Sequence, residues 1–132
     1  MSSLKITRWW LVRHAPVQNP KRLVYGQSDM PADLSDEKAL AALAGQLPGD
    51  AVWVTSHLSR THDTARSLQA FMDKDIAPQA ESGFAEQHFG DWELQNWNDL
   101  PKGETTRFWT DFARQHPPKG ESFADVVARV GP

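Results

Sequence analysis

The sequence contains no cysteine in its 132 residues. This absence excludes a disulfide framework, a thiolate nucleophile and any zinc or iron–sulfur site built on sulfur. No apolar run approaches the roughly 20 residues that a membrane-spanning helix needs. The N-terminus also has no basic stretch followed by an apolar core of the kind that marks a signal peptide. We therefore expect a cytoplasmic protein that does not contact membranes.

The chain also has no excess of positive charge. Lys and Arg number 14 and Asp and Glu number 17, so the net charge is −3, which disfavours nucleic acid as a partner. An anionic substrate would need a locally positive pocket. Hydrophobic residues make up 39% of the chain, enough to build a core. The length favours a single domain over residues 1–132.

Apolar runs alternate with helical patterns along the chain. Residues 9–12 predict a strand that is buried on both faces, and residues 51–54 predict a second strand. Residues 76–80 predict a weaker third strand, and Ser35 is the expected N-cap of the first helix. The helical patterns lie at residues 35–47, 65–72, 105–115 and 122–130. This order predicts a three-layer α/β/α sandwich with a mostly parallel sheet.

Basic side chains follow the two stronger predicted strands. Arg13 and His14 come directly after the first strand, and Arg60 follows the second by a few residues. Ligands bind at the carboxyl ends of parallel strands, and two guanidiniums suit a phosphate dianion. A neutral imidazole beside them can attack phosphorus if one ring nitrogen is held as a donor, so His14 is the candidate nucleophile. Glu86 has apolar neighbours that could keep it protonated by partial burial, and it is the candidate acid.

These residues fall within a series of motifs that runs along nearly the whole chain. In chain order the motifs are LVRHA at 11–15, YG at 25–26 with Asp29, TSHLSRT at 55–61 with TA at 64–65, EQHFGDWE at 86–93 and PKGES at 118–122. Together they resemble the histidine phosphatase superfamily, also called the phosphoglycerate mutase-like family. The resemblance is strongest to its small branch, which includes α-ribazole phosphatase and fructose-bisphosphatase-like proteins. It implies the phosphoglycerate mutase-like α/β fold.

The resemblance also implies a role for each site residue. Arg13 and Arg60 would bind the phosphoryl group, and His14 would become transiently phosphorylated. Glu86 would act first as general acid and then as base for the attacking water, without a metal or an organic cofactor. Asn19 matches the loop asparagine that touches phosphate in the family, although it lies one residue nearer to His14.

Two features depart from the family pattern. The residue after the nucleophile is usually Gly and is Ala15 here. Family members also continue, past the helix that begins at the GES motif, into another buried strand whose end carries a second phosphate-binding His. No residue here matches that His, so we expect a truncated or naturally short member with one phosphate donor fewer. The missing strand would leave apolar residues without a partner, which allows for a homodimer. These residues are Phe123, Val126, Val127 and Val130.

The function predicted from these residues is hydrolysis of a small phosphorylated metabolite. One alternative is a catalytically impaired member that binds or senses a phosphorylated ligand. A second is phosphoglycerate mutase activity, an isomerase reaction that needs a retained bisphosphate intermediate and a pocket that excludes water. Nucleic-acid binding is a distant third, because the net charge disfavours it.

The remaining histidines and the aromatic residues have simpler interpretations. The spacing of the histidines matches no compact metal-ligand set, so we expect no metal. These histidines are His57, His62, His88 and His116. A second group of aromatics could line a substrate lid, but their near-helical spacing favours a place in the core. This group is Trp92, Trp97, Phe108, Trp109 and Phe112.

Overall fold

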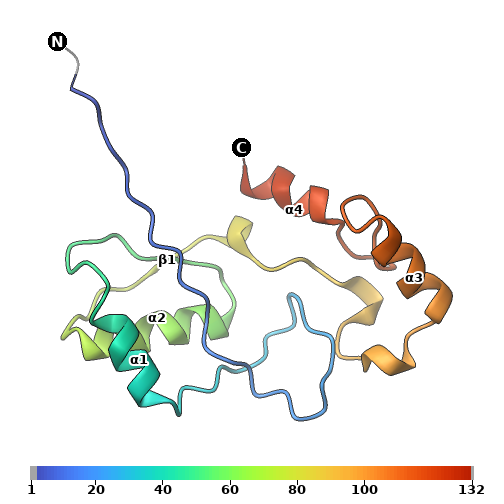
Figure 1. Cartoon of the computed structure of the whole chain (residues 1–132), viewed down its shortest axis with the longest axis horizontal. Coiled ribbons are helices and arrows are strands. Elements are labelled where there is room, and N and C mark those ends of the chain that lie inside the picture. Colours follow the sequence, from blue (N-terminus) through green and yellow to red (C-terminus); the bar gives the residue numbers. More distant parts are fainter. Residues whose placement is uncertain (1–2, 132) are drawn as a thin grey trace.

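The structure is a computed structural model that describes residues 3–131 (Figure 1). In chain order its helices and strands are α1 (Glu37–Ala44), β1 (Val54–Thr55), α2 (Ser59–Phe71), β2 (Gln79–Ala80), α3 (Lys102–Thr110) and α4 (Phe123–Val130). Short 3-10 helices lie between β2 and α3, namely η1 (Ser82–Phe84), η2 (Gly90–Trp92) and η3 (Trp97–Asp99). Among residues 3–131, every helix is too short or too polar to cross a bilayer.

The strands β1 and β2 form a small parallel sheet, which agrees with the predicted α/β class. Val54 lies opposite Gln79, and Thr55 lies opposite Ala80. The helix α2 connects the two strands, because parallel neighbours need a crossover rather than a hairpin. The strand predicted at residues 76–80 is thus confirmed at its carboxyl end.

The helices α1 and α2 pack against each other and form one of the two cores. Leu40 and Ala44 of α1 meet Leu68 of α2, and all three side chains are buried. Partly buried hydrophobic residues surround them, namely Leu34, Leu43, Leu47, Trp53 and Met72. Burial of this apolar surface stabilises α2, the helix whose first turn carries Arg60.

The first helix begins with a different cap from the one predicted. Ser35 is not the N-cap; the next residue, Asp36, takes that place, and its Oδ1 accepts a hydrogen bond of 3.0 Å from the Ala39 N–H. Helix α1 ends at Ala44, and Gly45 is its C-cap, so the helix stops before the predicted end at residue 47. Either residue type can cap a helix, so the sequence left these two neighbouring positions unresolved.

The last two helices agree with the sequence to different degrees. Ser122 caps α4 as predicted, and its Oγ accepts from the Asp125 N–H while the Asp125 carboxylate accepts from the Ser122 N–H. These hydrogen bonds hold the pKa of Asp125 below its ordinary value. Helix α3 begins at Lys102, earlier than the predicted 105–115, because the fixed φ of Pro101 already suits a helix start.

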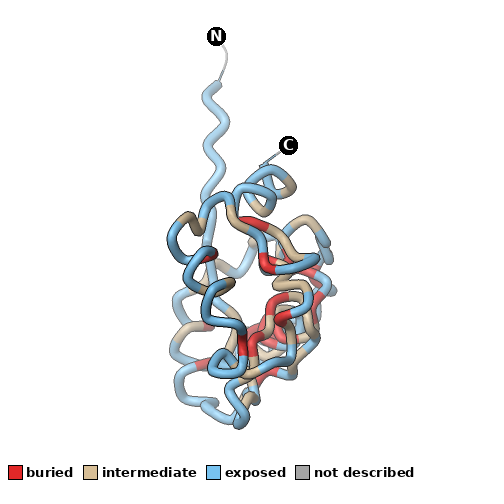
Figure 2. The backbone as a smooth tube through the Cα atoms, turned by 90° about the vertical axis from the view of Figure 1, so that its right-hand side faces the viewer, coloured by how far each residue is buried: buried red, intermediate tan, exposed pale blue. Residues whose placement is uncertain are grey.

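The N-terminal strand predicted at residues 9–12 is absent from the structure. Leu11 is 91% exposed and Trp9 is 74% exposed, and Figure 2 shows this segment as pale blue along its length. A strand forms only when a neighbour completes its hydrogen-bond ladder. Here, within residues 3–131, the segment is paired with no strand, and residues 9–14 and 51–56 both line a cavity of about 890 Å³. The prediction failed because an apolar run does not reveal whether a partner strand is present.

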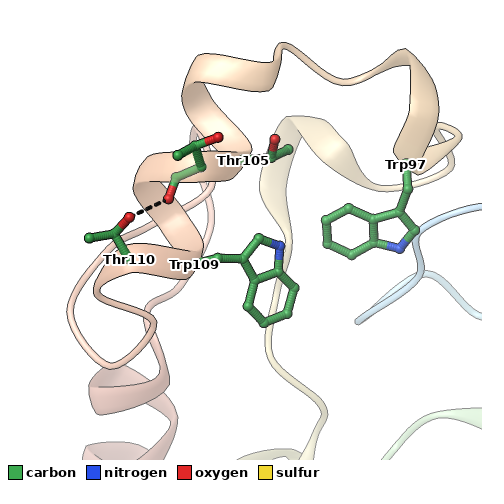
Figure 3. Close-up of a pocket in the computed structure, with 5 residues that line it drawn as sticks. Trp97, Thr105, Trp109 and Thr110 are labelled. Atoms are coloured by element: carbon green, nitrogen blue, oxygen red, sulfur yellow. Dashed lines mark hydrogen bonds between the residues drawn. The ribbon is translucent and has the colours of Figure 1, made fainter.

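The second core consists of aromatic and aliphatic residues, most of them from the segment between β2 and α4. Its buried members are Val24, Trp92, Leu100 and Phe108, with Phe89 and Phe112 packed against them. The prediction that the aromatic group is core is confirmed for Trp92 and Phe108 but wrong for Trp97 and Trp109, which are 38% and 58% exposed. These two indoles, with threonines of α3, line an open surface pocket of about 480 Å³ (Figure 3).

Candidate active site

His14 lies at the end of the extended N-terminal segment and is half-buried. Its Nδ1 is 2.6 Å from the carbonyl oxygen of Ala15. A carbonyl can only accept, so Nδ1 carries the hydrogen, and in the neutral imidazole the lone pair is then on Nε2. This is the tautomer that an imidazole nucleophile needs.

A threonine of α2 ties the His14 segment to the rest of the chain. The Ala15 N–H donates to Thr64 Oγ1 over 2.9 Å, and the Thr64 hydroxyl donates in turn to the carbonyl of Arg60 over 2.7 Å. Thr64 is buried. Arg13, His14 and Thr64 all line the 890 Å³ cavity. The hydrogen bond thus fixes the candidate nucleophile relative to the helix that carries Arg60.

Arg60 is the most completely enclosed charge of the site, with 1% of its surface exposed. Its Nη1 donates to the Ser28 carbonyl over 3.0 Å, and its Nη2 donates to the Gly26 carbonyl over 2.5 Å. The guanidinium also lies over the Tyr25 ring, 5.0 Å from its centroid. Its Nε has no hydrogen-bond partner among the described residues. Arg60 is therefore a buried cation that is paired with two backbone carbonyls and keeps one donor unpaired within residues 3–131, and it is not among the residues that line the 890 Å³ cavity.

The turn that holds Arg60 is itself held by two carboxylates. Glu93 Oε1 accepts from the Gly26 N–H over 2.6 Å and from the Ser28 N–H over 2.9 Å. Asp29 Oδ1 accepts from both the hydroxyl and the N–H of Ser59, and these hydrogen bonds hold the pKa of Asp29 below its ordinary value. The amides of the turn thus face Glu93, while its carbonyls face the Arg60 guanidinium.

Glycine is required in this turn by close approach of the backbone. A Cβ at Gly26 would lie 2.0 Å from the carbonyl oxygen of Gln87 and 2.7 Å from the Phe89 ring. Any side chain would therefore separate the turn from the segment that follows Glu86. Gly26, whose carbonyl accepts from Arg60, therefore lies directly against the Gln87 backbone, next to the candidate acid.

Glu86 lies on the irregular segment after η1 and is exposed. The partial burial predicted for it is wrong, because its neighbours Ala85 and Gln87 turn inward and are buried while Glu86 faces outward. Its Oε1 accepts from the Gln87 N–H over 2.8 Å. Its backbone carbonyl accepts from the side chains of Gln27 and Arg129.

Asn19 makes its hydrogen bonds inside its own loop. Its Nδ2 donates to the Leu23 carbonyl over 2.8 Å, and its Oδ1 accepts from the Leu23 N–H over 2.9 Å. Both polar ends of the amide therefore close the loop from residue 19 to residue 23. Contact between Asn19 and phosphate stays a prediction.

His88 and His116 have local partners. His88 Nδ1 accepts from the Gly90 N–H over 2.8 Å, and His116 Nδ1 lies 3.1 Å from the Gly120 carbonyl. Within the part of the chain that the structure describes, no three His, Asp or Glu side chains gather as a metal-binding group. Metal-free chemistry stays a prediction from the family resemblance.

Three residues that support the site, Thr64, Glu93 and Arg129, were not predicted to have a role. Thr64 and Glu93 stand inside motifs that carry the family resemblance, so the motifs contained a signal for them. Arg129 lies outside those motifs, in a helix whose pattern indicated only an apolar face. Its contacts with the segment around Glu86 depend on the tertiary fold.

Comparison with protein families agrees with the motifs found in the sequence. The family model of the histidine phosphatase superfamily (branch 1) matches residues 9–132. The chain therefore belongs to the histidine phosphatase superfamily, as the sequence motifs predicted.

Individual relatives agree with this assignment. The chain is 30% identical over 130 residues to the bifunctional protein Rv2228c of Mycobacterium tuberculosis, a match that covers 94% of this chain and 35% of the relative. The same identity and coverage hold for the protein Mb2253c of Mycobacterium bovis. The chain thus spans about a third of the length of these curated relatives.

Solved structures share the fold. A protein from Escherichia coli, described as a candidate alpha-ribazole-5'-P phosphatase, superposes with a TM-score of 0.74 at 26% identity, over 89% of this chain and 60% of that one. The protein TTHB049 from Thermus thermophilus superposes with a TM-score of 0.69 at 27% identity, over 89% of this chain and 65% of that one. These likenesses confirm the phosphoglycerate mutase-like fold class.

Proposed function

We propose that this chain carries the phosphohistidine site of a phosphomonoester hydrolase. The observation that carries the proposal is the 2.6 Å contact between His14 Nδ1 and the Ala15 carbonyl, which leaves the Nε2 lone pair free. The buried Arg60, anchored one helical turn from the threonine that holds Ala15, supplies positive charge for a phosphoryl group. Arg13, which lines the same cavity as His14, supplies a second guanidinium.

The first half of the reaction transfers the phosphoryl group to the protein. His14 Nε2 attacks phosphorus, the N–P bond forms, and the bond from phosphorus to the ester oxygen breaks. The Glu86 carboxyl gives its proton to the departing oxygen, so the product leaves as a neutral alcohol. Arg13 and Arg60 balance the charge on the phosphoryl oxygens during the transfer.

The second half of the reaction restores the free protein. The Glu86 carboxylate now accepts a proton from water, and the water oxygen attacks phosphorus. The N–P bond breaks, its electron pair returns to Nε2, and inorganic phosphate leaves. We propose that neither a metal ion nor an organic cofactor takes part, because the two guanidiniums supply the positive charge.

The substrate class we propose is a small phosphorylated metabolite. The Escherichia coli relative, described as a candidate alpha-ribazole-5'-P phosphatase, supports a compact phosphomonoester. A net charge of −3 is unfavourable for binding nucleic acid, so we assign no nucleic-acid or membrane partner. A cytoplasmic location stays a prediction from the N-terminal sequence.

A second copy of the chain is the protein partner we propose. Phe123, Val127 and Val130 of α4 are 46%, 54% and 44% exposed, and together they give the helix an apolar face. Pairing of two such faces would remove this surface from water. A monomer at micromolar concentration in sedimentation equilibrium would contradict the dimer.

A second candidate function is binding of a phosphorylated ligand without turnover. The observation that favours it is that, of the histidines in residues 3–131, His14 alone lines the cavity, so no second imidazole joins it there. Phosphoglycerate mutase activity is a weaker alternative. It needs water kept from the phosphohistidine, whereas the neighbouring residues 9–12 are exposed.

Hydrolysis of p-nitrophenyl phosphate by the purified chain tests the proposal. We expect turnover that is lost in His14→Ala, with His116→Ala as the matched control because that exposed imidazole lies on the loop before α4. Turnover that persists in His14→Ala would refute the role of His14. Binding of the substrate with no turnover by the unaltered chain would favour the binding function.

A further inference from the structure

Glu86 is held in place by contacts from outside its own segment. The 3-10 helix η1 ends at Phe84, and the backbone is extended at Ala85. An extended segment that belongs to no sheet has no ladder to fix it. The position of the Glu86 carboxyl must therefore come from side chains elsewhere in the chain.

Arg129 of α4 supplies the largest set of these contacts. Its Nη1 donates to the Gly83 carbonyl over 2.6 Å, and its Nη2 donates to the Glu86 carbonyl over 2.9 Å. Its Nε donates to Glu121 Oε1 over 2.8 Å. One planar guanidinium thus bridges the two ends of the segment and a carboxylate.

Glu121 binds the same segment at the next two residues, Gln87 and His88. Its Oε2 accepts from the His88 N–H over 2.8 Å, and its own N–H donates to the His88 carbonyl over 2.8 Å. Its carbonyl accepts from the buried Gln87 side chain over 2.7 Å. Arg129 and Glu121 together therefore fix the backbone on both sides of the Glu86 side chain.

The pair is charged and partly shielded from water. About a quarter of each side chain is exposed, 23% for Arg129 and 24% for Glu121. The Arg129 hydrogen bond holds the pKa of Glu121 below its ordinary value, and Glu121 raises the pKa of Arg129. Both groups therefore stay ionised at neutral pH, so the Arg129–Glu121 ion pair is present at that pH.

We propose that the Arg129–Glu121 pair is the positioning device for the acid and base of the reaction. By holding the Glu86 carbonyl, it places the Glu86 carboxyl where the ester oxygen leaves and where water later attacks. Arg129 and Glu121 touch no reacting atom in this scheme. The inference rests on the proposed role of Glu86, and it assigns a positioning role to Arg129 and Glu121.

The dependence of the rate on the leaving group separates positioning from general support of the fold. Nitrophenolate leaves without a proton, whereas an alkoxide needs one from Glu86. We expect Arg129→Met to lower kcat/KM for β-glycerophosphate by about 10²-fold, the low end of general acid catalysis. For p-nitrophenyl phosphate we expect a loss below about threefold. Equal losses for the two substrates would overturn the proposal.

Two further variants, Arg66→Met and Arg129→Lys, serve as controls. Arg66→Met removes an exposed guanidinium that pairs with Asp75, and it should change neither rate. Arg129→Lys keeps the charge but cannot span the Gly83 and Glu86 carbonyls, so it should show the same selective loss in weaker form. If Arg129→Lys leaves the rates for both substrates unchanged, the guanidinium contacts with the Gly83 and Glu86 carbonyls are not needed to position Glu86.

Amide hydrogen exchange tests the positioning without any turnover. We expect Arg129→Met to speed exchange at Gln87 and His88 by at least about tenfold, while amides of α2 keep their protection. Unchanged exchange at these two amides would overturn the proposal. If α2 loses protection as well, Arg129→Met has disturbed the whole fold. The test is then made with Arg129→Lys, which must speed exchange at Gln87 and His88 while α2 keeps its protection. An unaltered chain with no turnover would contradict the proposed function, and exchange alone would then decide the positioning.

Discussion

Arg60 and His14 come to the site from two regions that are built differently. Arg60 is buried, and its guanidinium donates to two carbonyls of the turn at residues 26–28. The Glu93 carboxylate holds that turn, and its Gly26 leaves no room for a side chain. His14 ends a segment whose residues 9–12 are exposed. One hydrogen bond, from the Ala15 N–H to Thr64, links that segment to α2. The surroundings of Arg60 are thus fixed by many contacts, whereas the position of His14, the proposed nucleophile, depends on few.

Among the residues of the site, the largest effect should come from Arg60. Arg60→Met would leave the carbonyls of Gly26 and Ser28 buried without donors, at a cost of about 2–4 kcal/mol in the free energy of unfolding. Urea denaturation measures this cost. The control Arg66→Met lies on the same helix but is exposed, and it should cost less than about 0.5 kcal/mol. Equal losses of unfolding free energy in Arg60→Met and Arg66→Met would contradict the claim that the buried arginine stabilises the fold more than the exposed one.

A smaller effect is expected at the link to the nucleophile. Thr64→Val keeps the shape but removes the acceptor for the Ala15 N–H, and it should cost about 1–2 kcal/mol in the free energy of unfolding. Thr110→Val is the matched control, because that exposed hydroxyl bonds only to the Thr106 carbonyl one turn earlier. Faster amide exchange at Ala15 should accompany the Thr64 change. If Ala15 exchange is unchanged, the segment has another anchor.

Acid should weaken the side of the site that α4 supports. The folded state lowers the pKa of Glu121, mainly through Arg129, so the folded chain binds a proton there less readily than the unfolded chain. Its contribution to stability is therefore complete above the pKa of the unfolded glutamate and is lost as the pH falls through the lower folded pKa. Melting temperatures between pH 6 and pH 3 should fall less steeply in Glu121→Gln than in the unaltered chain. Asp50→Asn, an exposed carboxyl before β1, should leave the slope unchanged.

The smallest effect is expected in the exposed N-terminal segment. Leu11→Ser should change the free energy of unfolding by less than about 0.5 kcal/mol, because 91% of the Leu11 surface is already in water. The same measurement on Leu68→Ala, in the core between α1 and α2, should show a loss of about 2–5 kcal/mol. A large loss in Leu11→Ser would mean that residues 9–12 are buried in solution.

The sequence predicted the parts of the fold that local patterns determine. The helical periodicity within α2 and the Ser122 cap of α4 depend on residues close in the chain, and both are confirmed. The strand at residues 9–12 was wrong because strand formation depends on a distant partner. For the site, the motifs supplied the candidates Arg13, His14 and Arg60.

The contacts around those candidates could not be predicted from the sequence. Glu93 reaches the Gly26 turn from 67 residues away, and Arg129 reaches Gly83 from 46 residues away. Glu86 faces outward because an extended segment alternates its side chains, and the sequence did not determine the phase of that alternation. Such contacts follow from the tertiary fold and leave no local pattern.

The position of the phosphoryl group on the His14 ring tests the proposed nucleophile most directly. The chain is mixed with p-nitrophenyl phosphate, quenched in alkali, and examined by phosphorus NMR against the two phosphohistidine isomers. Because Nδ1 donates to the Ala15 carbonyl, we predict phosphate on Nε2 of His14 and none in His14→Ala. Phosphate on Nδ1, or on a different histidine, would contradict the assignment of His14 Nε2 as the nucleophile.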